Sequence, residues 1–209
     1  MCLHALAKDR NQTIQFGRFL DNEAVSAGEM LTRAGQLTGA RVAGRHVLAI
    51  QDTTEINFAT HVASKRGFGI AGNGRDLGLF LHPLLAVDAG HGGVIGLLGA
   101  QVLNRTAGPA ADRKTRAADH KESRRWLSGA ETAGEVLADA AMITVVGDRE
   151  SDIYDQFARR PANVHLLTRA AQDRTLEGGV RLFGQVGAWE VRSRERIDVP
   201  PRGPRAARE

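Results

Sequence analysis

The chain has 209 residues, 42% of them hydrophobic, and a formal net charge of +4 whose basic part is mostly arginine. That size suggests one domain, or one domain with a small appendage, with enough apolar sequence for a sizeable core. No apolar run approaches the roughly 18–20 residues that span a membrane. Because Cys2 is the single cysteine, an intramolecular disulfide and a cysteine-based metal cluster are excluded, and a reducing, cytoplasmic setting is expected.

Residues 1–45 are predicted to be helical. Ser26 and Glu29 match the S-x-x-E capping box that often begins a helix. Apolar residues follow at helical spacing, namely Met30, Leu31, Ala34 and Leu37. The next apolar run, residues 47–50, predicts a short buried strand with Asp52 just beyond its end.

Residues 59–78 combine many glycines with the basic residues Lys65 and Arg66, and they are expected to form a loop. Three glycines within residues 67–72 satisfy the G-x-G-x-x-G spacing of dinucleotide-binding proteins. That fingerprint requires a strand before it and a helix after it. A charged loop precedes this copy, so dinucleotide binding is not predicted.

The rest of the chain is predicted to contain four further strands and two helices. The elements are, in order, strands at 77–89 and 93–105, a helix at 119–140, a strand at 142–146 that leads into Asp148, a short helix capped by Ser151, and a strand at 164–170. The short helix is expected to bury Ile153, Tyr154 and Phe157 before it stops at Pro161.

This order of elements predicts an α/β fold, a ribonuclease H-like mixed sheet flanked by helices and preceded by a helical segment. The first three strands are separated by connections too short for helical crossovers, so they form an antiparallel meander. The fourth and fifth strands are joined through a helix, so they are parallel. In this order the first and fourth strands are neighbours. Asp52 and Asp148 are therefore expected to lie close together at the centre of the sheet.

Two facing carboxylates can hold hard divalent ions, because Mg²⁺ and Mn²⁺ prefer oxygen ligands in octahedral geometry. In two-metal phosphoryl-transfer sites the ions lie about 3.5–4 Å apart. Local sequence leaves other roles open, since Asp52 can form an Asx-turn and Asp148 can cap a helix. His82, alone on an apolar strand, is interpreted as a satisfied core histidine. Arg169, at a strand end, is predicted to pair with an acid or to meet phosphate.

Four segments, in this order, resemble DDE transposases of the insertion sequence 4 family, in particular those of the bacterial transposon 5 type: LAIQDTTEINF, GLFLHPLLAV, DHKESRRWL and VVGDRESDIYDQF. The likeness covers almost the whole chain. Its most specific parts are the D-T-T and D-R-E-x-D motifs, each at a strand end. The resemblance implies that Asp52 and Asp148 are catalytic ligands of Mg²⁺, for which Mn²⁺ can substitute, in DNA strand cleavage and transfer.

The resemblance also implies double-stranded DNA as the partner, both transposon ends and target, with a homodimer in the DNA complex and no membrane. The implied location is the bacterial cytoplasm, with the nucleoid. Arg169 falls where the family places a basic residue near DNA, and Lys65, Arg66 and Lys121 are further predicted DNA-binding residues. The implied domains are a remnant of the DNA-end-binding region at 1–45, a catalytic core at 46–171 and the start of an inserted β-rich region at 172–209.

One departure from the family concerns its third acid, a glutamate in a Y-x-x-R-x-x-x-E pattern that this sequence lacks. The single tyrosine, Tyr154, stands in a different context. The expectation is a C-terminally truncated copy that is inactive alone, with the sheet face near Val145 and Leu167 exposed. Two alternatives remain: a non-catalytic DNA-binding or dimerising protein that inhibits an intact transposase, and a nuclease that uses two acids only.

Overall fold

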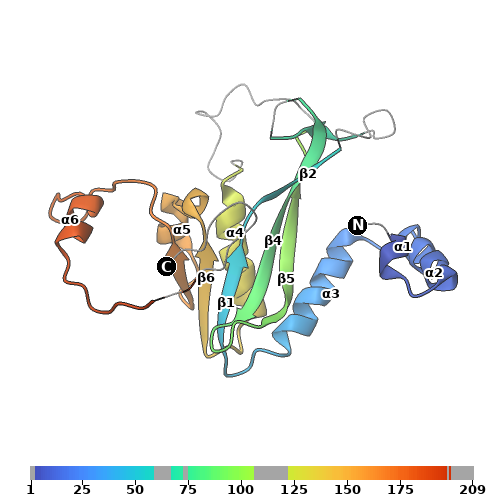
Figure 1. The fold of residues 1–209 in the computed structure, drawn as a ribbon, viewed down its shortest axis with the longest axis horizontal. Helices are drawn as coiled ribbons and strands as arrows, with labels where there is room; N and C mark the ends of the chain where they lie inside the picture. Colours follow the sequence, from blue (N-terminus) through green and yellow to red (C-terminus); the bar gives the residue numbers. More distant parts are fainter. Residues whose placement is uncertain (1–2, 59–66, 73–74, 106–121, 197, 199–209) are drawn as a thin grey trace. The chain divides into compact units, whose positions relative to one another are not determined.

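The computed structural model describes residues 3–58, 67–72, 75–105, 122–196 and 198 (Figure 1). The chain divides into two compact units, Met1–Arg169 and Ala170–Glu209. Both candidate acids belong to the first unit. The predicted DNA-binding residues Lys65, Arg66 and Lys121 lie outside the described residues.

A mixed β-sheet forms the centre of the first unit. The strands are β1 (His46–Gln51), β2 (Thr54–Asn57), β3 (Gly69–Ile70), β4 (Leu77–Asp88), β5 (Val94–Leu103), β6 (Met142–Gly147) and β7 (Val164–Thr168). They pair in the order β2-β4-β1-β6-β7, and β3 and β5 also pair with β4. β1, β4 and β5 form an antiparallel meander, whereas β6 and β7 run parallel to β1. The predicted adjacency of the first and fourth strands of the sequence, β1 and β6, is confirmed. The loop predicted at 59–78 is wrong in part, because it contains β3 and the start of β4, and β2 was not predicted.

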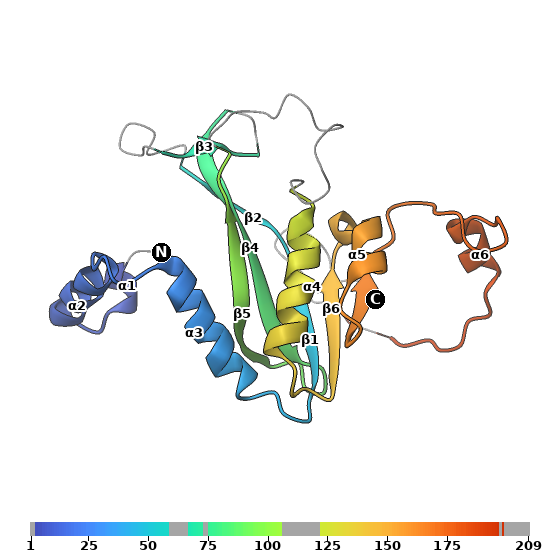
Figure 2. The ribbon, with the colours of Figure 1, turned by 180° about the vertical axis from the view of Figure 1, so that it is seen from behind.

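Helices cover one face of this sheet (Figure 2). Helix α4 (Arg124–Val136) packs along the sheet from β5 to β7, with α3 (Ala27–Gly39) and α5 (Tyr154–Arg159) beside it. Helix α4 buries an apolar stripe against the strands, and the helical spacing of these residues is what predicts the helix at 119–140: Trp126, Leu127, Ala130 and Ala133. The stripe packs against the buried side chains of β1 and β6 to form the core.

The opposite face of the sheet carries exposed apolar side chains, among them Ile50, which is 36% exposed, and Leu167, which is 60% exposed. The exposure predicted near Leu167 is thus confirmed, but the exposure predicted near Val145 is wrong, because Val145 is fully buried. Successive strand residues point to opposite faces. Val145 pairs with Leu166 on the helix-covered side, while Leu167 pairs with Val146 on the other.

The helical character predicted for residues 1–45 is confirmed over the described part of that segment. Helices α1 (Leu3–Leu6) and α2 (Arg10–Leu20) precede α3. The hydroxyl of Ser26 accepts the backbone N–H of Glu29 at 3.1 Å, so Ser26 caps α3 as expected.

The segment after β6 differs from its prediction. A 3₁₀ helix, η3 (Arg149–Ser151), comes before α5, and Ser151 is fully buried instead of capping α5. Tyr154 is 73% exposed and Phe157 is 39% exposed, whereas Gln156 is the buried side chain of α5. The extra 3₁₀ turn shifts the register of the helix, so a different set of side chains faces the core.

The second unit is described at residues 170–196 and 198. It contains helix α6 (Leu182–Ala188) and one isolated bridge between Thr175 and Arg181. These described residues include no strand, so the inserted β-rich region stays a prediction. Across the part of the chain that the structure describes, none of the helices has the length and apolar character needed to cross a membrane.

Candidate active site at the carboxyl ends of the parallel strands

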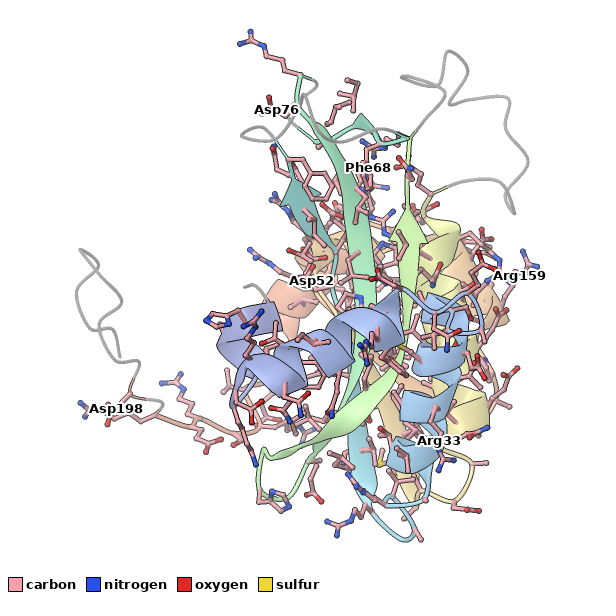
Figure 3. All side chains as sticks on the ribbon, turned by 90° about the vertical axis from the view of Figure 1, so that its right-hand side faces the viewer. Arg33, Asp52, Phe68, Asp76, Arg159 and Asp198 are labelled. Atoms are coloured by element: carbon pink, nitrogen blue, oxygen red, sulfur yellow. The ribbon has the colours of Figure 1, made fainter. Side chains whose placement is uncertain are left out.

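The register of the parallel strands brings the two candidate acids to equivalent positions. β1 and β6 pair in parallel as far as Ile50 with Val146. The same register, continued two positions, places Asp52 opposite Asp148. Neighbouring strands lie about 4.8 Å apart, so the two acids follow adjacent strand ends at equivalent positions. Asp52 is labelled in Figure 3, where β1 passes into β2.

Each acid accepts one hydrogen bond from a nearby backbone N–H. The N–H of Thr53 donates to Oδ1 of Asp52 at 2.7 Å. An Asx-turn would use the N–H two residues after the aspartate, so this bond to the adjacent residue does not form one. The N–H of Glu150 donates to Oδ1 of Asp148 at 2.8 Å, so Asp148 caps η3, as the local alternative predicted. Within the described part of the chain, Oδ2 of each exposed carboxylate accepts no hydrogen bond and is available to a ligand.

Two hydroxyl groups fix the backbone of Asp148. Ser151 Oγ donates to the carbonyl oxygen of Asp148 at 2.6 Å, and Thr168 Oγ1 donates to the same oxygen at 3.1 Å. The two hydroxyls are also in contact with each other. Ser151 is therefore buried because it joins the end of β6 to the end of β7, a role that its local sequence did not indicate.

Arg169 lies at the equivalent position beyond the next strand, β7. β6 and β7 pair as far as Gly147 with Thr168, so Arg169 stands opposite Asp148 at the next position. Arg169 is exposed and forms no ion pair with the described residues. A guanidinium group beside two carboxylates can bind phosphate through two parallel hydrogen bonds. The phosphate role predicted for Arg169 therefore remains open to it, and it has no acid as a direct partner among the described side chains.

A chain of hydrogen bonds runs behind Asp52. Arg125 Nε donates to Thr53 Oγ1 at 3.0 Å, and the Thr53 hydroxyl donates to His82 Nδ1 at 2.8 Å. His82 Nε2 donates to Gln51 Oε1 at 3.2 Å, and Gln51 Nε2 donates to the carbonyl oxygen of Trp126 at 3.2 Å. The directions follow from the last bond, because a carbonyl only accepts and the amide oxygen must then face a donor. In the neutral form of His82, the proton is accordingly on Nε2.

The environment of His82 favours the same neutral state. The ring is 2% exposed and meets Trp126 edge-on at 4.7 Å between centroids. Desolvation by burial is the main cause that lowers the pKa of His82 from 6.5 to about 4. The charge of Arg125 lowers this pKa further, and the charge of Asp52 opposes the shift. The interpretation of His82 as a satisfied core histidine is confirmed.

Arg125 also reaches the turn that follows β6. Its Nη2 lies 3.3 Å from Glu150 Oε2, and its Nη1 donates to the carbonyl oxygen of Glu122 at 2.8 Å. Only 13% of the Arg125 side chain is exposed, whereas 61% of Glu150 is. Arg125 is therefore in contact with residues next to both candidate acids.

Glu122, in the DHKESRRWL segment, has a structural role. It accepts two hydrogen bonds from Arg105, at 2.7 and 2.6 Å. The guanidinium of Arg105 lies 4.4 Å from the ring centroid of Phe80. The pair ties the segment before α4 to the end of β5.

A cavity of about 680 Å³ lies on the helix-covered side between α3, α4 and β5. His82 and Gln101 are on its wall, but neither Asp52 nor Asp148 lines it. The cavity is therefore distinct from the candidate active site.

The donor set at the strand ends fits Mg²⁺ or Mn²⁺. Mg²⁺ usually keeps several waters and takes one or two carboxylates together with substrate phosphates. Asp52 and Asp148 each offer one carboxylate oxygen. The positive charge of Arg169 can pair with the negative charge of a phosphate bound beside them. Among the described residues no cluster of three or more histidine, cysteine or acidic side chains is placed to hold a metal ion. Asp52 and Asp148 are thus the two carboxylates that such an ion would use among the described residues.

The sequence did not single out Arg125, Thr53 or Gln51 as site residues. Two of them flank Asp52, and Arg125 lies in a short basic run before Trp126. No periodicity or motif indicates that the arginine side chain returns from α4 to the end of β1.

Among models of known protein families, none matches the chain.

Proposed function

We propose that the chain is the ribonuclease H-like catalytic region of a DDE-type DNA transposase. The observation that carries the proposal is the parallel register of β1, β6 and β7, which, continued past the last paired residues, aligns Asp52, Asp148 and Arg169 just beyond the carboxyl ends of the three strands. The neighbour relations β5-β4-β1-β6-β7, with one antiparallel meander and two parallel strands, agree with a ribonuclease H-like sheet. The two motifs D-T-T and D-R-E-x-D supply the acids.

The proposed substrate is double-stranded DNA at transposon ends and at the target. Asp52 and Asp148 hold the divalent ion from the protein side, and Arg169 orients the phosphate that reacts. Bound Mg²⁺ supplies charge stabilisation for the attacking oxygen and for the leaving 3′ oxygen. Both acids are exposed, so a bulky duplex can approach them without prior rearrangement of the core.

The chain lacks the sequence pattern that carries the third acid of the family. Glu150, the acid two residues after Asp148, is engaged by Arg125. Loss of a group that stabilises the transition state costs on the order of 3–5 kcal/mol, roughly a hundred- to several-thousand-fold in rate. We therefore expect these 209 residues to bind divalent ions and DNA but to catalyse strand transfer poorly unless a further carboxylate is supplied.

Titration of the purified chain with Mn²⁺, followed by calorimetry, tests this proposal. Asp52→Asn and Asp148→Asn should each weaken Mn²⁺ binding at least about tenfold, because each removes a charged ligand. Asp139→Asn is the matched control, since Asp139 is an exposed aspartate in the loop before β6. Its binding should equal that of the wild type. Equal Mn²⁺ affinity in all four proteins would overturn the proposal.

A nicking assay on supercoiled DNA in Mn²⁺ then tests the reaction. Residual nicking by the wild type should disappear in Asp148→Asn and persist in Asp139→Asn. Nicking that survives both active-site substitutions would identify a contaminating nuclease and count against this site.

The exposed apolar face of the sheet, with Ile50 and Leu167, favours a second candidate function. A chain that binds DNA or forms dimers without catalysis can inhibit an intact transposase. Addition of the chain to an active homologue, at equal concentration, distinguishes the two. Inhibition that persists in Asp148→Asn supports the second function.

A further inference from the structure

Arg125 occupies the start of α4 and is held on several sides. Its Nη1 donates to the carbonyl oxygen of Glu122 at 2.8 Å, and its guanidinium lies 5.5 Å from the ring centroid of Trp126. The side chain is 13% exposed. An arginine with this burial and these contacts has one defined position, unlike the solvated arginines of the surface.

The other two guanidinium nitrogens of Arg125 contact two separate turns. Nε donates to Thr53 Oγ1 at 3.0 Å, and Nη2 lies 3.3 Å from Glu150 Oε2. The backbone N–H of Thr53 is the one that donates to Asp52, and the backbone N–H of Glu150 is the one that donates to Asp148. Each acid is thus held by a residue whose side chain Arg125 binds.

We propose that Arg125 is a positioning residue that sets the spacing between the Asp52 and Asp148 carboxylates by bridging the two turns that hold them. The inference rests on the proposed function in so far as those carboxylates bind a divalent ion. Lysine cannot replace the bridge, because a single ammonium group lacks the planar fork that reaches two acceptors at fixed angles. Arg125 itself does not touch the ion or the substrate.

The chain of neutral hydrogen bonds behind Thr53 supports the bridge. Thr53 accepts from Arg125 and donates to His82, which is anchored in turn by Gln51. Because His82 and Gln51 are both buried, the Thr53 end of the bridge rests on the core of the first unit. The Glu150 end of the bridge is exposed. The position of the Glu150 turn therefore depends more on its contact with Arg125 than that of the Thr53 turn does.

Simple electrostatics and positioning predict opposite effects of removing the arginine. A positive charge near two carboxylates repels a cation, so Arg125→Gln should tighten Mn²⁺ binding if charge is all that matters. If Arg125 sets the geometry, its loss should weaken Mn²⁺ binding by about tenfold or more, as for other residues that orient metal ligands. Arg125→Lys keeps the charge and loses the bridge, so it should weaken binding as Arg125→Gln does.

The experiment is Mn²⁺ calorimetry on the wild type, Arg125→Gln, Arg125→Lys and Arg45→Gln. Arg45 forms a 2.7 Å ion pair with Asp88 at the other end of β1, so it controls for the loss of a guanidinium–carboxylate pair. Weaker binding in both Arg125 variants and unchanged binding in Arg45→Gln is the expected result. Wild-type affinity in Arg125→Lys, or tighter binding in Arg125→Gln, would overturn the positioning role.

Amide hydrogen exchange gives a second measurement that needs no metal ion. The Thr53 and Glu150 amides should exchange faster together in Arg125→Gln, by roughly tenfold, and keep their wild-type rates in Arg45→Gln. Unchanged exchange at both amides would refute the bridge. If Asp52→Asn and Asp148→Asn leave Mn²⁺ binding unchanged, the proposed function fails, and the exchange rates still decide the role of Arg125.

Discussion

Arg169 stands opposite Asp148 across the parallel pair β6 and β7, one position beyond the last paired residues of the two strands. Positive charge at that point offsets the repulsion between the nearby carboxylates and a DNA phosphate. Because the side chain is exposed, its contribution to the proposed DNA binding would be electrostatic and would depend on salt.

We expect Arg169→Gln to lower the affinity for duplex DNA and to reduce the slope of log affinity against log salt by about one. Fluorescence anisotropy across a salt series measures both quantities. Arg41→Gln, at an exposed position before β1, is the control and should keep the wild-type slope. An equal decrease in the two variants would show that only net charge matters.

The buried imidazole of His82 makes stability depend on pH. Its pKa is about 4 in the folded protein against 6.5 as the ordinary value, so the unfolded chain binds the proton first as pH falls. The free energy of unfolding should therefore decrease from pH 6.5 to pH 4, by up to about 3 kcal/mol, and this contribution is constant above that window. Urea denaturation at several pH values measures the effect.

His82→Asn removes the titrating group and should flatten the pH dependence between 4 and 6.5, whatever its effect on absolute stability. Asp88 does not confuse this window. The hydrogen bond from Arg45 lowers the pKa of Asp88 below 3.8, so most of its stabilisation is lost below pH 4. A wild-type slope that persists in His82→Asn would refute the assignment.

Gln156 and Gln51 are both buried amides, but only one is satisfied. Within the described residues, neither polar side-chain atom of Gln156 has a hydrogen-bond partner, whereas both of those of Gln51 do. Methionine has nearly the same shape without the amide. We expect Gln156→Met to raise the free energy of unfolding by about 1–3 kcal/mol and Gln51→Met to lower it by a similar amount. Thermal and urea denaturation of the pair give the two signs, and destabilisation by both would contradict this account.

Gly35 allows α3 to lie directly against β5. A Cβ at this position would stand 2.7 Å from the carbonyl oxygen of Leu98, which is backbone and cannot move aside. Gly35→Ala should therefore cost about 1–3 kcal/mol of stability, although alanine is the better helix former. Gly28→Ala, in the same helix, meets no atom closer than 3.9 Å and should be neutral or stabilise by up to about 1 kcal/mol. Equal effects in a denaturation series would show that α3 does not pack this closely.

Several features could be predicted from the sequence because they depend on local patterns and connection lengths. The short link between β4 and β5 favours an antiparallel pair, and the link through α5 favours parallel strands β6 and β7. The apolar stripe around Trp126 predicted which face of α4 is buried. The capping role of Asp148 also follows from its place between a strand and a helical turn.

Other features required the tertiary structure, because they depend on contacts between residues far apart in the chain. The extra 3₁₀ turn at Arg149–Ser151 decided that Gln156 is buried and Tyr154 is exposed. The register between β6 and β7 decided that Val145 lies beside Leu166 on the helix-covered face, while Leu167 lies beside Val146 on the other face.

The sequence by itself predicted that β1 and β6 are neighbours and placed Asp52 and Asp148 at strand ends, since period and loop length are local properties, but it did not predict β2 or β3. Only the tertiary structure decided which side chains support those acids. Arg125 meets Thr53 and Glu150 because α4 packs across the ends of β1 and β6. That meeting depends on strand register and helix position, which are set by the packing of the whole core and leave no periodic trace in the sequence.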